Sequence, residues 1–225
     1  MRNMSKVQKE IIRNNKGRTH FTFRGIRLGG CLFLFCILAC NISKKPGLEE
    51  GVERMQIVAK SGDVIVRNGN DEVSNTARSF NRKDKTYSHC GLVQVERDTV
   101  FVYHALGGNY NPSQKLLRQT LKDFCSDEDI DKVALFRYPL NDKERGILSA
   151  WILDRYGEGL PFDLFFNFQT DDKMYCSEFV FKGLNAAKND SLHKLQPQKD
   201  EVIYVAIDDL YFNEWAKKVI EAKID

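Results

Sequence analysis

The sequence contains no internal repeat and no low-complexity segment, which excludes solenoid and fibrous architectures. Its composition, with 42% apolar and 29% charged residues, is that of an ordinary globular protein and not of a disordered chain. At 225 residues, the chain is long enough for one domain with a substantial core and a leader segment.

Most of the chain also lacks an excess of positive charge. The net charge is +3, but residues 1–27 hold eight Lys or Arg and one acid, Glu10, which gives +7 for that segment alone. Residues 28–39 carry no charge, so residues 40–225, with 26 basic and 30 acidic side chains, have a net charge of −4. A mildly acidic domain without a basic stripe lacks the electrostatic footprint of a nucleic-acid-binding protein. We therefore expect no nucleic-acid partner.

The apolar run Leu28-Gly-Gly-Cys-Leu-Phe-Leu-Phe-Cys-Ile-Leu-Ala39 is too short to span a bilayer. Twelve helical residues reach about 18 Å, whereas the hydrocarbon core is roughly 30 Å thick. Because a basic segment precedes the run, we predict a signal peptide over residues 1–39. Its end, Ile37-Leu-Ala-Cys40, resembles a bacterial lipobox, which implies cleavage before Cys40 and lipidation of the Cys40 thiol. A plain signal peptide and an uncleaved signal anchor are the alternatives.

Residues 40–57 begin with a stretch that carries charge, Pro and Gly but no apolar pattern, which predicts a tether. The remaining residues, 58–225, then form the folded domain. Together these segments predict a lipoprotein of the cell envelope, which a lipid anchor on Cys40 attaches to the membrane and which faces the periplasm or the exterior.

Three of the six cysteines lie at or before residue 40, and the other three are Cys90, Cys125 and Cys176. An odd number of cysteines in an exported domain leaves at least one thiol free or paired with another molecule. A free thiol outside the cytoplasm is exposed to oxidation, so a chemical role is one explanation for it. The other explanation is that all three are small buried residues, which is common for cysteine.

The domain shows both β-type and helical patterns. We predict strands over 62–67, 90–95, 99–105, 132–138 and 202–207, and helices over 71–80, 113–125, 142–156, 176–187 and 209–223. Asn141 and Glu144 have the spacing of a capping box at the start of the third helix, and Gly157 suits its C′ position. Because strands and helices come in clusters and do not alternate strictly, the pattern indicates the α+β class.

Three histidines follow the leader, and His193 lies in a polar segment where we expect it to be solvated. The other two flank the predicted hairpin. If that hairpin turns at Glu96-Arg97, positions opposite each other sum to 193, so His89 faces His104 across the ladder. Cys90 follows His89 directly, so its side chain would point to the opposite face of the strand, into the core.

Cys176 stands at the predicted start of a helix, in Tyr175-Cys-Ser-Glu-Phe-Val180. A helix N-terminus supplies positive dipole and unpaired N–H groups, which favour a thiolate and can receive an oxyanion. An activated nucleophile also needs a base beside it and a third group that orients the base. Cys176, His89 and His104 provide these three parts.

Four segments together resemble a known family: Gly62-Asp-Val-Ile65, Tyr87-Ser-His-Cys-Gly-Leu-Val93, Tyr103-His-Ala105 and Tyr175-Cys-Ser-Glu-Phe-Val180. They are similar to the permuted papain-like amidases of the YaeF/YiiX type, in the NlpC-type peptidase superfamily, which are distant relatives of lecithin retinol acyltransferase. The resemblance implies a circularly permuted papain-like fold, in which helices pack on an antiparallel sheet and the nucleophile sits at a helix N-terminus.

The resemblance also implies roles for individual residues. Cys176 matches the nucleophile and His89 the base. His104 falls where the family has a polar third member, often Glu, and a histidine there resembles the acyltransferase relatives. No cofactor is implied.

Three functions are consistent with this sequence. The leading prediction is hydrolysis of an amide bond, through an acyl-enzyme on Cys176, with a cell-wall peptide such as that of peptidoglycan as the expected substrate. The first alternative is acyl transfer or lipid-ester hydrolysis by the same residues. The second is an envelope lipoprotein without catalysis, or one that binds zinc through the two histidines and the cysteine.

Overall fold

The computed structural model describes residues 46–126, 128–192 and 204–224. The predicted leader, the lipidation candidate Cys40 and His193 lie outside these residues. None of the helices in the described part of the chain has the length and apolarity that a bilayer crossing requires.

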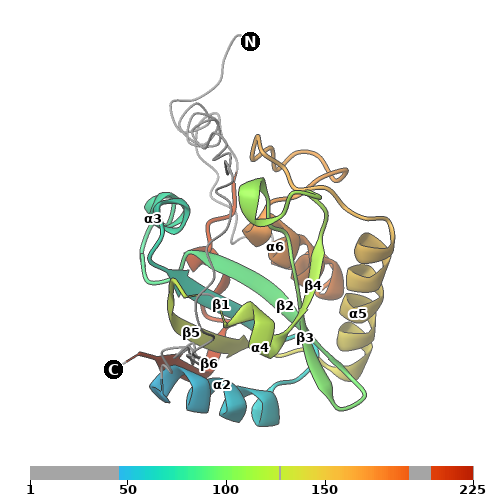
Figure 1. Cartoon of the computed structure of the whole chain (residues 1–225). Coiled ribbons are helices and arrows are strands. Elements are labelled where there is room, and N and C mark those ends of the chain that lie inside the picture. Colours follow the sequence, from blue (N-terminus) through green and yellow to red (C-terminus); the bar gives the residue numbers. More distant parts are fainter. Residues whose placement is uncertain (1–45, 127, 193–203, 225) are drawn as a thin grey trace, which may run out of the picture. The chain divides into compact units, whose positions relative to one another are not determined.

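One antiparallel sheet organises the domain, with the strand order β4-β3-β2-β1-β5-β6. Its strands are β1 (Val64–Gly69), β2 (His89–Glu96), β3 (Thr99–His104), β4 (Leu117–Thr120), β5 (Ile130–Arg137) and β6 (Lys217–Lys223). The strands β3, β2, β1 and β5 therefore lie in the interior of the sheet and are covered on both faces (Figure 1).

Helices cover the two faces of this sheet. They are α2 (Pro46–Val58), α3 (Glu72–Ser79), α4 (Leu121–Phe124), α5 (Asp142–Gly157) and α6 (Cys176–Ala187), with short 3-10 turns η1 (Gly108–Tyr110) and η3 (Asp208–Leu210). Helices α5 and α6 pack on one face, and α2 and α4 on the other (Figure 1). This mixture of helices and an antiparallel sheet agrees with the predicted α+β class.

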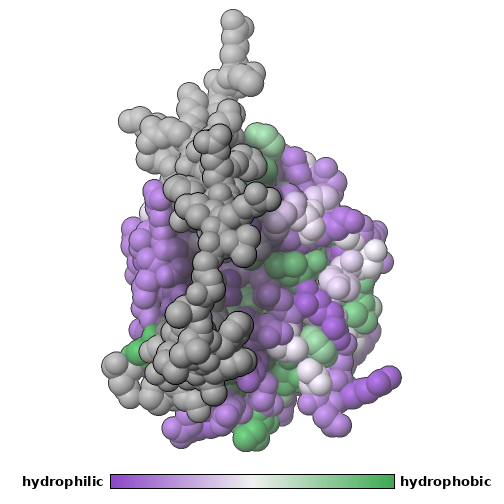
Figure 2. Space-filling view, in the orientation of Figure 1, coloured by the Kyte–Doolittle hydropathy of each residue, from purple (hydrophilic) through white to green (hydrophobic). Residues whose placement is uncertain are grey.

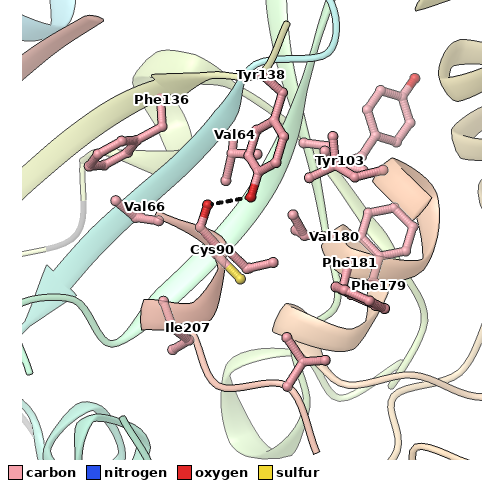
Figure 3. Packing of buried hydrophobic residues seen from close by; sticks show 14 of the residues in the cluster. Val64, Val66, Cys90, Tyr103, Phe136, Tyr138, Phe179, Val180, Phe181 and Ile207 are labelled. Atoms are coloured by element: carbon pink, nitrogen blue, oxygen red, sulfur yellow. Dashed lines mark hydrogen bonds between the residues drawn. The ribbon is translucent and has the colours of Figure 1, made fainter. Parts of the chain in front are cut away.

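Alternation along the central strands divides the apolar residues between two cores. Val64 and Val66 of β1 point toward α5 and α6, in the core that Figure 3 shows, whereas Ile65 points toward α2 and α4. Cys90 and Leu92 of β2 follow the same rule and join the first core. The face of the molecule in Figure 2 is mostly hydrophilic, with small separate apolar areas.

The predicted tether is wrong for the residues that the structure describes. Residues 46–57 belong to α2, and its Leu48, Val52 and Met55 are buried against the sheet. These three positions follow one another at helical spacing, so they form a single narrow apolar stripe on a helix that also carries four charged residues. Helix α2 is therefore part of the folded domain.

The helix predicted over 142–156 is confirmed, and Asn141 and Glu144 form the expected capping box. The helix ends later than predicted, because Gly157 is still helical and Glu158 is the C-cap. Gly159, with φ of +67°, adopts the left-handed conformation that the sequence suggested for Gly157.

Three other element predictions are wrong. Residues 113–125, predicted as one helix, contain β4 and the single turn α4, and residues 209–223, also predicted as a helix, contain the edge strand β6. The described residues 204–207 of the predicted strand 202–207 are not in a strand. Because β4 and β6 are edge strands with few buried side chains, their sequences lack the alternation that identifies strands, and pairing with β3 and β5 decides their conformation.

Candidate active site

Cys176 is the first residue of α6, and side chains on both sides of it fix this helix start. The Tyr175 hydroxyl accepts a hydrogen bond from the Val205 backbone N–H at 2.9 Å, and the Ser177 hydroxyl donates to the Val205 carbonyl at 2.8 Å. The backbone N–H of Tyr175 also donates to the Glu178 carboxylate at 3.3 Å. The nucleophile candidate is therefore held between two residues that are tied to the chain segment opposite the helix.

The Cys176 thiol is partly exposed, whereas Cys90 and Cys125 are buried. A hydrogen bond from the Cys90 thiol lowers the pKa of Cys176, and the backbone N–H of Ser177 acts in the same direction, although burial opposes both. Burial raises the pKa of Cys90. Of these two neighbouring thiols, Cys176 is therefore the one that ionises first. Cys90 itself lies among core side chains near Val180 and Ile207, as predicted (Figure 3).

His89 and His104 are in direct contact, with Nε2 of His89 lying 2.8 Å from Nδ1 of His104. The predicted proximity is confirmed, but the predicted register is wrong. Glu96 pairs with Thr99 and Leu92 with Tyr103, so the turn consists of Arg97 and Asp98.

The register differs from the predicted one by two residues, and an even shift leaves every side chain on the same face of the sheet. His104 then stands opposite Gly91, where an added Cβ would lie only 3.1 Å from the Cβ of His104. Because Gly91 leaves this position empty, the two imidazoles meet along the diagonal of the ladder.

Both imidazoles lie against the Phe124 ring of α4, at centroid distances of 5.8 Å for His89 and 5.1 Å for His104. The Arg67 guanidinium lies 4.6 Å from the same ring and donates to the Phe124 carbonyl at 2.5 Å. Burial lowers the pKa of His89 well below its ordinary value and that of His104 to about 3, and the positive charge of Arg67 adds to both shifts. Both histidines are therefore neutral at physiological pH.

The start of β2 positions both the thiol and the histidine pair. His89 and Cys90 are consecutive, so their side chains leave the strand on opposite faces, and it is the free thiol of Cys90 that lowers the pKa of Cys176. Among the described residues, no hydrogen bond joins Cys176 to either histidine. The structure therefore brings His89 and His104 together and places Cys176 beside the residue that follows His89.

Sequence reasoning did not identify Gln119, whose Oε1 lies 2.8 Å from Nε2 of His104. Gln119 pairs with Val102 across the β3–β4 ladder, which places it on the same face as His104. Residues 113–125 were predicted to be helical, so the pairing of β4 with β3 that brings Gln119 to His104 was not expected. Arg67 was also missed, since an arginine at the end of a strand has no pattern that distinguishes it from a solvated surface residue.

Two acidic residues of the family-like segments support the fold around the site. Asp63 is almost fully buried and forms a two-pronged ion pair with Arg137 of β5, at 2.7 and 2.6 Å. Glu178 is fully buried on α6, and burial raises its pKa to about 7 although Lys182 lies 2.8 Å from its carboxylate. Both carboxylates have a structural role, fixing β1 against β5 and the start of α6.

A cysteine at the N-terminus of a helix that packs on an antiparallel sheet, with two hydrogen-bonded imidazoles on that sheet, supplies the groups of a papain-like cysteine hydrolase. The comparisons with known proteins agree with this class. The chain belongs to the family described as permuted papain-like amidase enzyme, YaeF/YiiX, C92 family, whose sequence profile matches residues 58–203. The protein is accordingly an enzyme, a hydrolase of the cysteine amidase or peptidase type.

The fold is similar to that of a solved structure described as metalloprotein yiiX from Escherichia coli O157:H7. The two chains are 19% identical, the alignment covers 71% of this chain and 96% of the other, and the TM-score is 0.53. This similarity supports the fold. No curated protein sequence matches the chain.

Proposed function

We propose that the protein hydrolyses an amide bond with Cys176 as nucleophile and His89 as general base. The contact between Nε2 of His89 and Nδ1 of His104 is the observation that carries this proposal. Because it occupies one ring nitrogen of His89, the other nitrogen, Nδ1, is left to accept the proton of a thiol. Cys176 stands beside the next residue of the same strand and has a lowered pKa.

The proposed reaction has two steps. His89 Nδ1 takes the thiol proton while the sulfur attacks the carbonyl carbon, and backbone N–H groups at the start of α6 receive the oxyanion. Collapse of this intermediate breaks the C–N bond, and the proton passes from His89 to the departing amine. Water, deprotonated by His89, then attacks the thioester, which releases a carboxylic acid and restores the thiol. His104 acts as a positioning residue for His89.

The substrate that we propose is a peptide of the cell wall, such as that of peptidoglycan. The proposed lipoprotein signal, with lipidation at Cys40, supports an envelope location, and the family's description as amidases supports a C–N bond as the target. We propose that the enzyme is anchored to the membrane through Cys40 and faces the periplasm or the exterior.

Two measurements on soluble protein that begins after Cys40 test this function. Labelled muropeptides of several stem-peptide types should be cleaved by the wild type but not by Cys176→Ala or His89→Ala, whereas Cys125→Ala, which alters a buried thiol with no proposed role in the reaction, should retain activity. Iodoacetamide should label Cys176 faster than Cys90 and Cys125 in a manner that depends on His89. Labelling no faster than at the two buried cysteines would refute the catalytic assignment. No cleavage of any muropeptide by a protein with fast labelling would refute only the substrate.

The first alternative is acyl transfer or lipid-ester hydrolysis by the same residues. The observation that favours it is the hydrogen bond between His89 and His104. A histidine as the third member of the catalytic group is the feature shared with the acyltransferase relatives. This function requires a fatty-acyl thioester on Cys176 after incubation with phospholipid vesicles. Mass spectrometry of the intact protein would detect the adduct, and its absence would eliminate this alternative.

The second alternative, zinc binding or a role without catalysis, has less support. The similar solved structure is described as a metalloprotein, but the described residues of this chain hold no group of three His, Cys, Asp or Glu that could bind a metal ion together. His104 in particular uses one ring nitrogen for His89 and the other for Gln119. These residues do not fit a zinc site, and metal analysis of the purified protein tests that conclusion.

A further inference from the structure

We propose that Gln119 is a positioning residue that sets the tautomers of His104 and His89, and so leaves Nδ1 of His89 free to act as the base. The proposal rests on the function proposed above. It adds a fourth member to the site, on β4, that neither the sequence motifs nor the comparisons assign.

Two successive hydrogen bonds connect Gln119 to His104 and His104 to His89, and the donors in both bonds are set by Gln119. Gln119 Oε1 lies 2.8 Å from Nε2 of His104, and Nδ1 of His104 lies 2.8 Å from Nε2 of His89. A carbonyl oxygen can only accept, so the proton of neutral His104 must be on Nε2. Nδ1 of His104 is then an acceptor, which places the proton of His89 on Nε2. Nδ1 of His89 consequently has a free lone pair.

The reverse orientation would inactivate the site. If the amide nitrogen of Gln119 faced His104, Nε2 of His104 would accept and its proton would move to Nδ1. That proton would be donated to Nε2 of His89, and His89 would carry its own proton on Nδ1. An imidazole in this state cannot take a proton from the thiol. One carboxamide therefore decides whether His89 is a base toward Cys176.

These two hydrogen bonds keep this direction only while both imidazole rings are neutral, because an imidazolium donates from both nitrogens. The charged groups around the pair favour neutrality. Arg67 approaches from β1 and disfavours a second positive charge, and both histidines are buried. Gln119 itself is half-buried and lines a hollow of about 250 Å³ together with Arg67 and Asp123. Asp123 is exposed and bonded to Thr120, which leaves Gln119 as the group that contacts His104 from that side.

Two substitutions separate this role from a packing role. Gln119→Leu removes the acceptor, and Gln119→Glu keeps an acceptor while it adds a negative charge. The readout is acylation of Cys176 by p-nitrophenyl acetate, followed through release of p-nitrophenolate, with Cys176→Ala as background. We expect the Leu variant to acylate at least about tenfold more slowly at neutral pH, since it loses a buried hydrogen bond that orients the base. The Glu variant should restore acylation and move the acid limb of the pH profile to higher pH, because its carboxylate favours the imidazolium.

A Leu variant that acylates within about twofold of the wild type, with an unchanged pH profile, would overturn the role of Gln119 while His89→Ala remains inactive. If His89→Ala and Cys176→Ala both acylate normally, the proposed function itself fails. Nitrogen NMR of the wild-type imidazoles is independent of any variant that does not fold. It should show protonated Nε2 and bare Nδ1 in both His89 and His104, and a proton on Nδ1 of His89 would refute the proposal.

Discussion

The thiol of Cys90, the residue that directly follows the proposed base on β2, lowers the pKa of the Cys176 thiol. The two sulfur atoms have opposite preferences, because the pKa of Cys176 is lowered while burial raises that of Cys90. Cys90 therefore does more than fill the core, since it lowers the pKa of the proposed nucleophile. The core position predicted for it is correct, but the pattern of alternating faces could not reveal this contact with a helix 86 residues later in the chain.

Removal of the Cys90 thiol should weaken the proposed nucleophile. Cys90→Ala is expected to raise the pKa of Cys176 and to slow its labelling by iodoacetamide at pH 6.5 by up to about tenfold for each unit of pKa gained. Cys90→Ser keeps a donor at the same place and should restore much of the rate. Mass spectrometry of the labelled peptide gives the rate at each pH. Equal rates in the Ala variant and the wild type would show that the thiol of Cys90 does not affect Cys176.

The neutrality of His89 makes a prediction about pH. Burial and Arg67 lower its pKa well below 6.5, so the protonated form of the base appears only at more acidic pH. Acylation of Cys176 should therefore lack an inflection near pH 6.5, and it should show a normal solvent isotope effect, because the thiol proton is transferred as the sulfur attacks. An inflection at pH 6.5 without an isotope effect would instead indicate a preformed thiolate–imidazolium pair.

The sequence alone was sufficient for the central parts of this fold. The apolar interior strands β1, β2 and β5, the capped helix α5 and the helix that begins at Cys176 were all predicted, because each carries its own local pattern. The two histidines were also brought together correctly despite a wrong register, since the error of two residues preserved their face.

What could not be predicted depends on contacts between distant segments. Gln119 reaches His104 only because the edge strand β4 pairs with β3, and nothing in the sequence of β4 requires that pairing. Arg67 affects the histidines through the field of its charge in a buried site, which no motif encodes. Helix α2 was missed because its three buried residues are a narrow stripe among charged ones.

The buried carboxyl of Glu178 should make the stability of the fold depend on pH. Burial raises its pKa from 4.5 to about 7, so between these values the folded state keeps a proton that the unfolded state has released. Stability therefore falls as pH rises from 4.5 to 7, by no more than about 3 kcal/mol at 1.36 kcal/mol for each pKa unit. Glu178→Gln removes this titration, so the variant should gain stability relative to the wild type between pH 5 and pH 8.

Urea unfolding at both pH values measures this difference. Phe181→Leu, a substitution in the same helix that removes no ionisable group, serves as control and should change the free energy of unfolding equally at both pH values. A Gln variant whose difference from the wild type is the same at pH 5 and pH 8 would contradict the raised pKa of Glu178.

Helix α2 gives a prediction that opposes simple helix propensity. Alanine favours a helix over glycine by about 1 kcal/mol, yet a Cβ at Gly51 would lie 2.2 Å from the Cβ of Ala222 on β6. Gly51→Ala should therefore destabilise the domain, and Ala222→Gly in the same chain should relieve part of that loss. At Gly146 of α5 an added Cβ meets nothing within 4 Å, so Gly146→Ala should stabilise the domain by about 0.5–1 kcal/mol. Urea unfolding of the wild type, the two single alanine variants and the double variant measures these differences. Stabilisation by both single alanines would mean that α2 does not pack on β6 and that residues 46–57 are a tether.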